Sequence, residues 1–285
     1  MTMNGTITDQ GRQYFCLVCL GLLLAGCARG GAEATPFAPS PTTPASVTDT
    51  PVATDVPSRN LPGGLTWEEH ELAGAPGLEP LSFMPVEGTQ SEILSRHAGL
   101  RDQGFEDHSF FDGPNPAMWA PWEDGRIVAR VLTSQTGEPR QTVEVVRGDR
   151  LIGSFDAGLP SPALPIQGLW TFDGLWVLEM LLSTPEEWTG QVFVDGTSLN
   201  DAGGYDETFS FQLLADRPFY LYRRDGKIGL NFDGQDADLG YDDVPHYRCC
   251  SESVVNPKHA QQLVAFFAQR AGTWYYVEIG AFGGD

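Results

Sequence analysis

The sharpest chemical feature of this sequence is a pair of neighbouring cysteines, Cys249 and Cys250, in the segment Tyr247-Arg-Cys-Cys-Ser. In an oxidising compartment two adjacent thiols can form a disulfide that strains the peptide between them and presents a rigid surface to a ligand. Alternatively, they stay as two free thiols on opposite faces of a strand, or they bind a soft metal or a thiol of another chain. The sequence leaves these three outcomes open.

A second group of chemical interest lies just upstream, in a turn-rich segment that contains five aspartates and ends at His246. Asp233, Asp236 and Asp238 could supply oxygen ligands to Ca²⁺. Their spacing differs from that of an EF-hand loop, because neither the required glycine nor the terminal glutamate is present. A solvated acidic loop is the alternative interpretation, and no other cofactor is expected.

Two tryptophans, Trp119 and Trp122, occur in a proline-rich segment that begins at Asn115. An indole on a loop can stack against the apolar face of a sugar while its N–H stays available as a donor. The competing interpretation is that both rings cover the core of a β fold. The two tryptophans are therefore candidates for a ligand-stacking site.

Known catalytic motifs are missing from the sequence. It contains no Gly-x-Ser-x-Gly elbow, no His-Glu-x-x-His helix, no phosphate-binding glycine loop and no dinucleotide fingerprint, and its five histidines are scattered. Pairs of carboxylates suited to glycoside hydrolysis are uninformative here, because 38 acidic residues always allow some pair. The sequence therefore favours a protein without catalytic residues.

The charge balance restricts the partners that this protein can have. The formal net charge is −21, and residues 61–285 carry 34 acidic and 14 basic residues. Such a field repels polyanions, so we expect no nucleic-acid partner, while cations are attracted. Acidity also keeps an exported protein soluble.

The folded part is predicted to be all-β. Six Asp-Gly pairs, a strong signal for two-residue hairpin turns, are spread over residues 112–234 between runs of alternating apolar residues. Strands are expected at 126–133, 141–147, 150–155 and 168–172, and a hairpin is expected around Ala271-Gly272. Helix is scarce, with short candidates at 91–100 and 258–263.

A faint repeat suggests how these hairpins are arranged. Similar turns place glycines at 125, 174, 226 and 272, a period near 50 residues. One four-stranded propeller blade has about this length. We therefore predict a small propeller-like fold of antiparallel hairpins, with a β-sandwich or an irregular barrel as the alternatives.

The N-terminal segment carries an export signal. Residues 13–26 form an apolar run that is too short to span a bilayer, and it ends in Leu24-Ala25-Gly26-Cys27. This tetrapeptide resembles the lipobox of bacterial lipoproteins, and the resemblance covers only the first 27 residues. It implies a signal peptide over 1–26, cleavage before Cys27 and attachment of lipid (such as palmitate) to that cysteine.

A tether follows the expected lipidation site. Residues 27–62 are rich in proline, threonine and serine, a composition that forms an extended spacer rather than a packed core. Residues 63–285 are then expected to form a single all-β domain.

Together, these features predict a lipid-anchored β domain on the extracytoplasmic face of the cell membrane. We expect a non-catalytic binding or scaffold module of the cell envelope, with a small molecule, a glycan or an envelope protein as its ligand. The alternatives are an envelope hydrolase that acts on polysaccharide, and a redox or metal sensor that uses Cys249 and Cys250.

Overall fold

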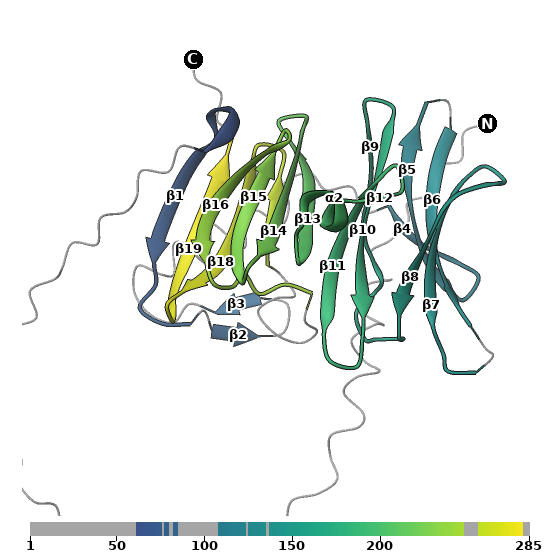
Figure 1. The fold of residues 1–285 in the computed structure, drawn as a ribbon, viewed down its shortest axis with the longest axis horizontal. Coiled ribbons are helices and arrows are strands. Elements are labelled where there is room, and N and C mark those ends of the chain that lie inside the picture. The colour runs from purple at the N-terminus through teal and green to yellow at the C-terminus, as the bar shows by residue number, and fades with distance from the viewer. Residues whose placement is uncertain are drawn as a thin grey trace, which may run out of the picture. The chain divides into compact units, whose positions relative to one another are not determined.

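The computed structural model of this protein describes residues 61–75, 77–79, 82–84, 108–123, 125–134, 137–247 and 256–281. Strands make up nearly all of its regular structure, so the all-β prediction is confirmed (Figure 1). The exceptions in this part of the chain are the 3-10 turn η2 (Pro62–Gly64) and the short helix α2 (Leu199–Gly203). No helix within the same residues is long and apolar enough to cross a membrane.

The largest sheet, which we call the long sheet, runs in the order β12-β11-β10-β8-β7-β6-β5-β4, with β9 also paired to β10. A single parallel contact, between Ser183 and Gly158, joins β10 to β8, and all other pairs are antiparallel. The strands are β4 (Ser109–Asp112), β5 (Asn115–Trp122), β6 (Gly125–Thr133), β7 (Gln141–Arg147), β8 (Arg150–Gly158), β9 (Ile166–Phe172), β10 (Leu175–Ser183), β11 (Trp188–Val194) and β12 (Thr197–Ser198).

Two four-stranded sheets follow, which we call the middle sheet and the C-terminal sheet. The middle sheet contains β13 (Glu207–Leu214), β14 (Arg217–Arg224), β15 (Lys227–Phe232) and β16 (Gln235–Tyr241) in chain order. The C-terminal sheet has the order β1-β19-β18-β17 and contains β1 (Thr66–Glu71), β17 (Lys258–Ala260), β18 (Leu263–Arg270) and β19 (Thr273–Gly280). A separate two-stranded sheet pairs β2 (Gly77–Glu79) with β3 (Ser82–Met84).

The strand and turn predictions agree closely with this structure. Asp173-Gly174 and Asp225-Gly226 have positive φ at both residues, as a type I′ hairpin turn requires. The hairpin expected at Ala271-Gly272 joins β18 to β19. By contrast, the short helix expected at 258–263 is wrong, because Lys258–Ala260 pair with β18 as strand β17. The other helix candidate lies outside the described residues.

The repeat of about 50 residues marks hairpins rather than identical sheets. Its four glycines close the turns β5–β6, β9–β10, β14–β15 and β18–β19. The first two turns lie in the long sheet and the last two in separate four-stranded sheets. None of the sheets formed by the described strands closes on itself.

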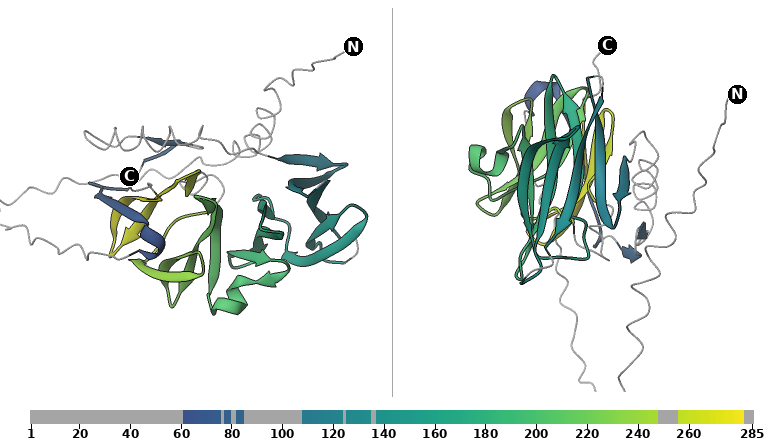
Figure 2. Two further views of the ribbon diagram at one scale, coloured as in Figure 1. Left: turned by 90° about the horizontal axis from the view of Figure 1, so that it is seen from above. Right: turned by 90° about the vertical axis from the view of Figure 1, so that its right-hand side faces the viewer.

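The middle sheet is covered by apolar side chains on both faces, because it packs against both of its neighbours. Phe209, Leu221 and Leu230 face the C-terminal sheet, where they meet Val264 and Phe266. The opposite face packs against the long sheet, where Phe211, Tyr220 and Tyr222 of the middle sheet meet Val177 and Val192 of the long sheet. The middle sheet accordingly lies between the other two in Figure 1 and in the left panel of Figure 2.

Candidate functional site

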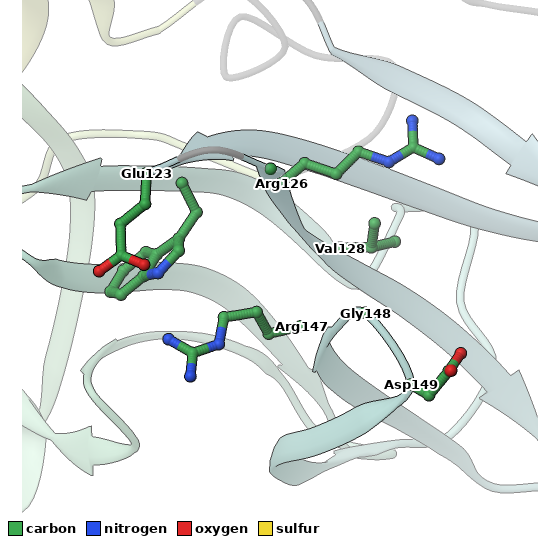
Figure 3. A pocket seen from close by; sticks show the side chains of 8 residues that line it. Glu123, Arg126, Val128, Arg147, Gly148 and Asp149 are labelled. Carbon is green, nitrogen blue, oxygen red and sulfur yellow. The ribbon is translucent and has the colours of Figure 1, made fainter.

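A hollow of about 640 Å³ lies where the β5–β6 and β7–β8 hairpins turn (Figure 3). Trp122 and Arg147 are the last residues of β5 and β7, so the turns that follow them bring both side chains to the same end of the sheet. Positive φ at Glu123 and Gly148 makes these turns tight. The residues that line the hollow are Trp122, Glu123, Gly125, Arg126, Val128, Arg147, Gly148 and Asp149.

Trp122 is half-buried and provides the main apolar surface of this hollow. Part of its ring packs against the core of the long sheet, and the guanidinium carbon of Arg147 lies 5.7 Å from the ring centroid. The indole Nε1 is shielded from solvent and has no hydrogen-bond partner. Because this atom is out of reach of solvent, a ligand in the hollow contacts the exposed part of the ring and not the N–H.

Trp119 lies elsewhere, although the sequence placed it with Trp122. The two residues are three positions apart in β5, so their side chains project from opposite faces of the strand. The Trp119 ring stacks on the His108 imidazole, with centroids 3.9 Å apart and planes 9° apart. One face of Trp119 is thus covered from within the protein, and Trp122 is the better candidate for stacking.

The three aspartates of the predicted calcium site already have protein partners. Asp236 accepts hydrogen bonds from Tyr205 and Asn231 and pairs with Arg224, while Asp233 pairs with Arg217 at 3.7 Å. Asp238 accepts a hydrogen bond from the Gly240 amide at 2.7 Å. Among the described residues, no group of three or more histidine, cysteine, aspartate or glutamate side chains is placed to hold a metal ion.

The three cysteines of interest fall in parts of the chain that the structure leaves undescribed. Cys249 and Cys250 lie between the described Tyr247 and Asn256, and Cys27 precedes residue 61. Their lipidation and redox state stay as predictions.

A second, buried group of polar residues joins the long sheet to the middle sheet. Glu179 on β10 is only 3% exposed, and its two oxygens accept hydrogen bonds from the backbone amides of Ser210 at 2.8 Å and Phe211 at 2.7 Å. These amides belong to a β-bulge in β13 between Phe209 and Gln212. A bulge removes ladder partners, so the Glu179 carboxylate supplies what the strand lacks.

Glu207, the first residue of β13, makes the reciprocal connection to β11. Its Oε1 accepts from the Gly190 amide at 2.8 Å and lies 3.0 Å from His246 Nε2, while Oε2 lies 3.4 Å from Arg223 Nε. The neighbouring Thr208 hydroxyl accepts from the Val192 amide at 2.9 Å. Side-chain oxygens of β13 therefore take the place of a backbone ladder between these sheets.

The two buried carboxyls have opposite electrostatic surroundings. Burial raises the pKa of Glu179 to about 7, against the opposing effect of the Phe211 and Ser210 amides. Burial would also raise the pKa of Glu207, but His246, the Gly190 amide and Arg223 together hold that pKa below its usual value. Glu179 is therefore partly protonated near pH 7, whereas Glu207 is held as an anion.

His246 and His259 complete this buried region from the C-terminal side. His246 Nδ1 lies 2.5 Å from the Val244 carbonyl oxygen, and its ring stacks on Phe209 with centroids 3.7 Å apart. His259 Nε2 lies 2.6 Å from the Ser210 hydroxyl, and burial lowers the pKa of His259 to about 4. A Ser–His contact of this kind also occurs in nucleophilic sites. Here, however, the backbone amides of Ser210 and Phe211 both donate to Glu179. Neither amide is therefore free to stabilise the oxygen of a reacting carbonyl group.

This buried group therefore has the properties of a structural junction. Each oxygen of Glu179 and Glu207 is already engaged by an amide, a hydroxyl or a cationic side chain. Sequence reasoning singled out His246, but as a neighbour of the predicted metal ligands, and it missed Glu179, Glu207 and Ser210. The available signal was a single glutamate within the apolar run Leu175-Trp-Val-Leu-Glu-Met-Leu-Leu, since a charge in a buried strand requires specific partners.

Comparisons with known proteins add no relative: no family model, no curated protein and no solved structure matches this chain. The site must therefore be interpreted from its own chemistry.

Proposed function

We propose that this protein is a lipid-anchored, extracytoplasmic module that binds a ligand in the hollow beside Trp122 without catalysing its conversion. The observation that carries the proposal is the half-buried Trp122 ring beside a hollow of about 640 Å³ that Arg126 and Arg147 also line. An aromatic surface beside a few polar and charged side chains is a common composition of a ligand site.

The buried carboxyls support a module that binds over one that hydrolyses. A glycosidase needs two carboxyls that face the scissile bond, with room for a sugar and a water molecule between them. Glu179 and Glu207 instead accept hydrogen bonds from backbone amides of strands on the neighbouring sheet. Their distinct pKa values follow from these contacts and from His246.

We further propose that the sheets are the blades of a small propeller. Two features support this arrangement. The middle sheet contains four consecutive antiparallel strands, and the C-terminal sheet is completed by β1, the first strand of the folded part, which pairs with β19 from Thr66–Gly280 to Glu71–Tyr275. Propellers commonly hold ligands at the loops that connect their strands, where the hollow beside Trp122 also lies.

The anchor rests on Leu24–Cys27 and on the tether that follows. Replacement of Cys27 by serine removes the acceptor of the lipid, so the full-length variant should leave the membrane fraction of its native host for the soluble fraction or remain unprocessed. Retention of the variant in membranes, resistant to high salt but released by detergent, would overturn this part of the proposal.

Ligand binding is tested with the full-length protein and a panel of short soluble oligosaccharides, both neutral and acidic, by titration calorimetry. At least one oligosaccharide should bind, and Trp122→Ala should weaken its binding about tenfold or more, as loss of a central aromatic contact does. Trp188→Ala is the matched control, because Trp188 is also half-buried in a strand of the long sheet but lies outside the hollow. Binding that is unaffected by Trp122→Ala, or no binding across the panel, would refute the proposed site.

A further inference from the structure

We infer that the hollow beside Trp122 recognises an acidic glycan, a chain of sugars that carry carboxylate groups. This inference rests on the proposed function and specifies its ligand. It is based on the way in which arginines are distributed over an otherwise acidic protein.

Most arginines of the described residues are paired with a carboxylate. Nine arginines fall in this part of the chain, and six of them lie within 3.7 Å of an aspartate or glutamate oxygen. These six are Arg130, Arg140, Arg217, Arg223, Arg224 and Arg270. With 38 acidic residues in the sequence, pairing is the expected state of an arginine.

The other three arginines occur together at the hollow. Arg126 and Arg147 line it, and Arg150 pairs with Arg147 across the β7–β8 hairpin. All three are exposed, and none forms an ion pair with a carboxylate of the described residues. Arg147 contacts the Trp122 ring instead. The arginines without a carboxylate partner among the described residues are therefore concentrated around the Trp122 ring and its hollow.

The overall negative charge does not prevent an anion from binding here. At physiological ionic strength the Debye length is about 8 Å, so distant surface carboxylates are largely screened. Glu123 and Asp149 also line the hollow and match the charges of Arg126 and Arg147, so the neighbouring Arg150 supplies the one positive charge in excess among these described residues. That local excess decides which charge the ligand carries.

The directions of the side chains favour an extended ligand over a single small anion. In Figure 3 the Arg147 guanidinium points to the side on which Glu123 lies, whereas the Arg126 guanidinium points the opposite way. One small anion cannot bridge groups that diverge in this way, but successive sugars of a chain can reach them. Guanidinium groups hold carboxylates through paired hydrogen bonds, and the Trp122 ring beside Arg147 can support a sugar face.

The test compares two oligomers that differ only in charge: oligogalacturonate and the same oligomer with every carboxyl methyl-esterified. Titration calorimetry with the full-length protein should show that oligogalacturonate binds at least about tenfold more tightly at low salt, the usual effect of a charge-assisted hydrogen bond. Its affinity should fall as NaCl is raised to about 0.5 M, because salt screens exposed charges.

Substitutions assign the effect to the arginines. Arg126→Gln and Arg147→Gln should each weaken oligogalacturonate binding about tenfold, and should weaken binding of the esterified oligomer by a clearly smaller factor. Arg140→Gln is the matched control, since Arg140 is exposed but already paired with Asp156 at 2.7 Å.

Three results would overturn the inference, and they also separate it from the proposed function. Equal binding of both oligomers, abolished by Trp122→Ala, would retain the binding site and refute its anionic specificity. Binding of single-stranded DNA with the same affinity and arginine dependence would show that the site recognises charge alone. Absence of binding by either oligomer and by every member of the oligosaccharide panel would refute both proposals.

Discussion

The protonation of Glu179 should make the stability of this protein depend on pH in a defined direction. Burial raises the pKa of Glu179 from its usual value of 4.5 to about 7 in the folded state. The folded protein therefore holds this proton more tightly than the unfolded chain does. The stability contributed by the group is fully present below about pH 4.5 and is lost as the pH rises through about 7. One pKa unit corresponds to about 1.4 kcal/mol, so the whole change amounts to about 3 kcal/mol.

The variant Glu179→Gln isolates this effect, because an amide does not titrate. Urea unfolding of both proteins, followed by tryptophan fluorescence, gives their free energies of unfolding from about pH 4.5 to about pH 8. The advantage of the wild-type protein over the variant should shrink by about 3 kcal/mol across this range, since all other groups titrate in both proteins. The variant should be less stable at low pH, because its amide N–H₂ opposes a backbone amide at Ser210 or Phe211.

A wild-type advantage that stays constant or grows with pH would refute this reasoning. It would mean that the amides of Ser210 and Phe211, together with the Tyr247 hydroxyl, stabilise the Glu179 anion by more than burial destabilises it. The junction would then hold a permanent charge at neutral pH.

Three further predictions concern the junction and the anchor. Glu207→Ala should lower the free energy of unfolding by about 3 kcal/mol, because it leaves the Gly190 amide and the His246 ring without their buried partner. Glu144→Ala, at the part-buried pair with Arg130, should cost at most about 1 kcal/mol in the same urea assay. Gly190→Ala should lower the melting temperature strongly, since a Cβ there would lie 2.6 Å from a backbone oxygen of β13, whereas a Cβ at Gly125 meets nothing closer than 3.9 Å and Gly125→Ala should have little effect. Removal of the tether, residues 28–60, should leave the melting temperature of the Cys27-anchored protein nearly unchanged in scanning calorimetry; a large decrease would show that the tether packs on the folded part.

The junction explains how sheets with no backbone ladder between them are held in place. Glu179 on β10 and Glu207 on β13 each accept hydrogen bonds from backbone amides of the opposite sheet. Gly190 on β11 has no side chain and so allows β13 to approach as closely as these hydrogen bonds need. The same residues would be poor surroundings for a substrate, since their hydrogen-bonding capacity is already used. We therefore attribute binding to the hollow and stability to the junction.

Local sequence determined the strands and turns of this protein. Asp-Gly pairs such as Asp173-Gly174 and Asp225-Gly226 adopt the positive φ angles of hairpin turns. The predicted strands at 126–133, 141–147 and 168–172 match β6, β7 and β9 to within two residues. These features are predictable because a turn conformation and a period-2 pattern depend on residues that are neighbours in the chain.

Tertiary structure alone decided which polar groups meet. Glu179 and Ser210 are 31 residues apart, and no pattern in the sequence connects Glu207 to His246, because their contact depends on how two sheets pack. Trp119 and Trp122 look equivalent in the sequence, but the alternation of the strand sends them to opposite faces, and only Trp122 reaches a hollow. In the same way, the sequence shows an acidic protein with few arginines. Only the fold shows that Arg126, Arg147 and Arg150 lie together without carboxylate partners from the described residues.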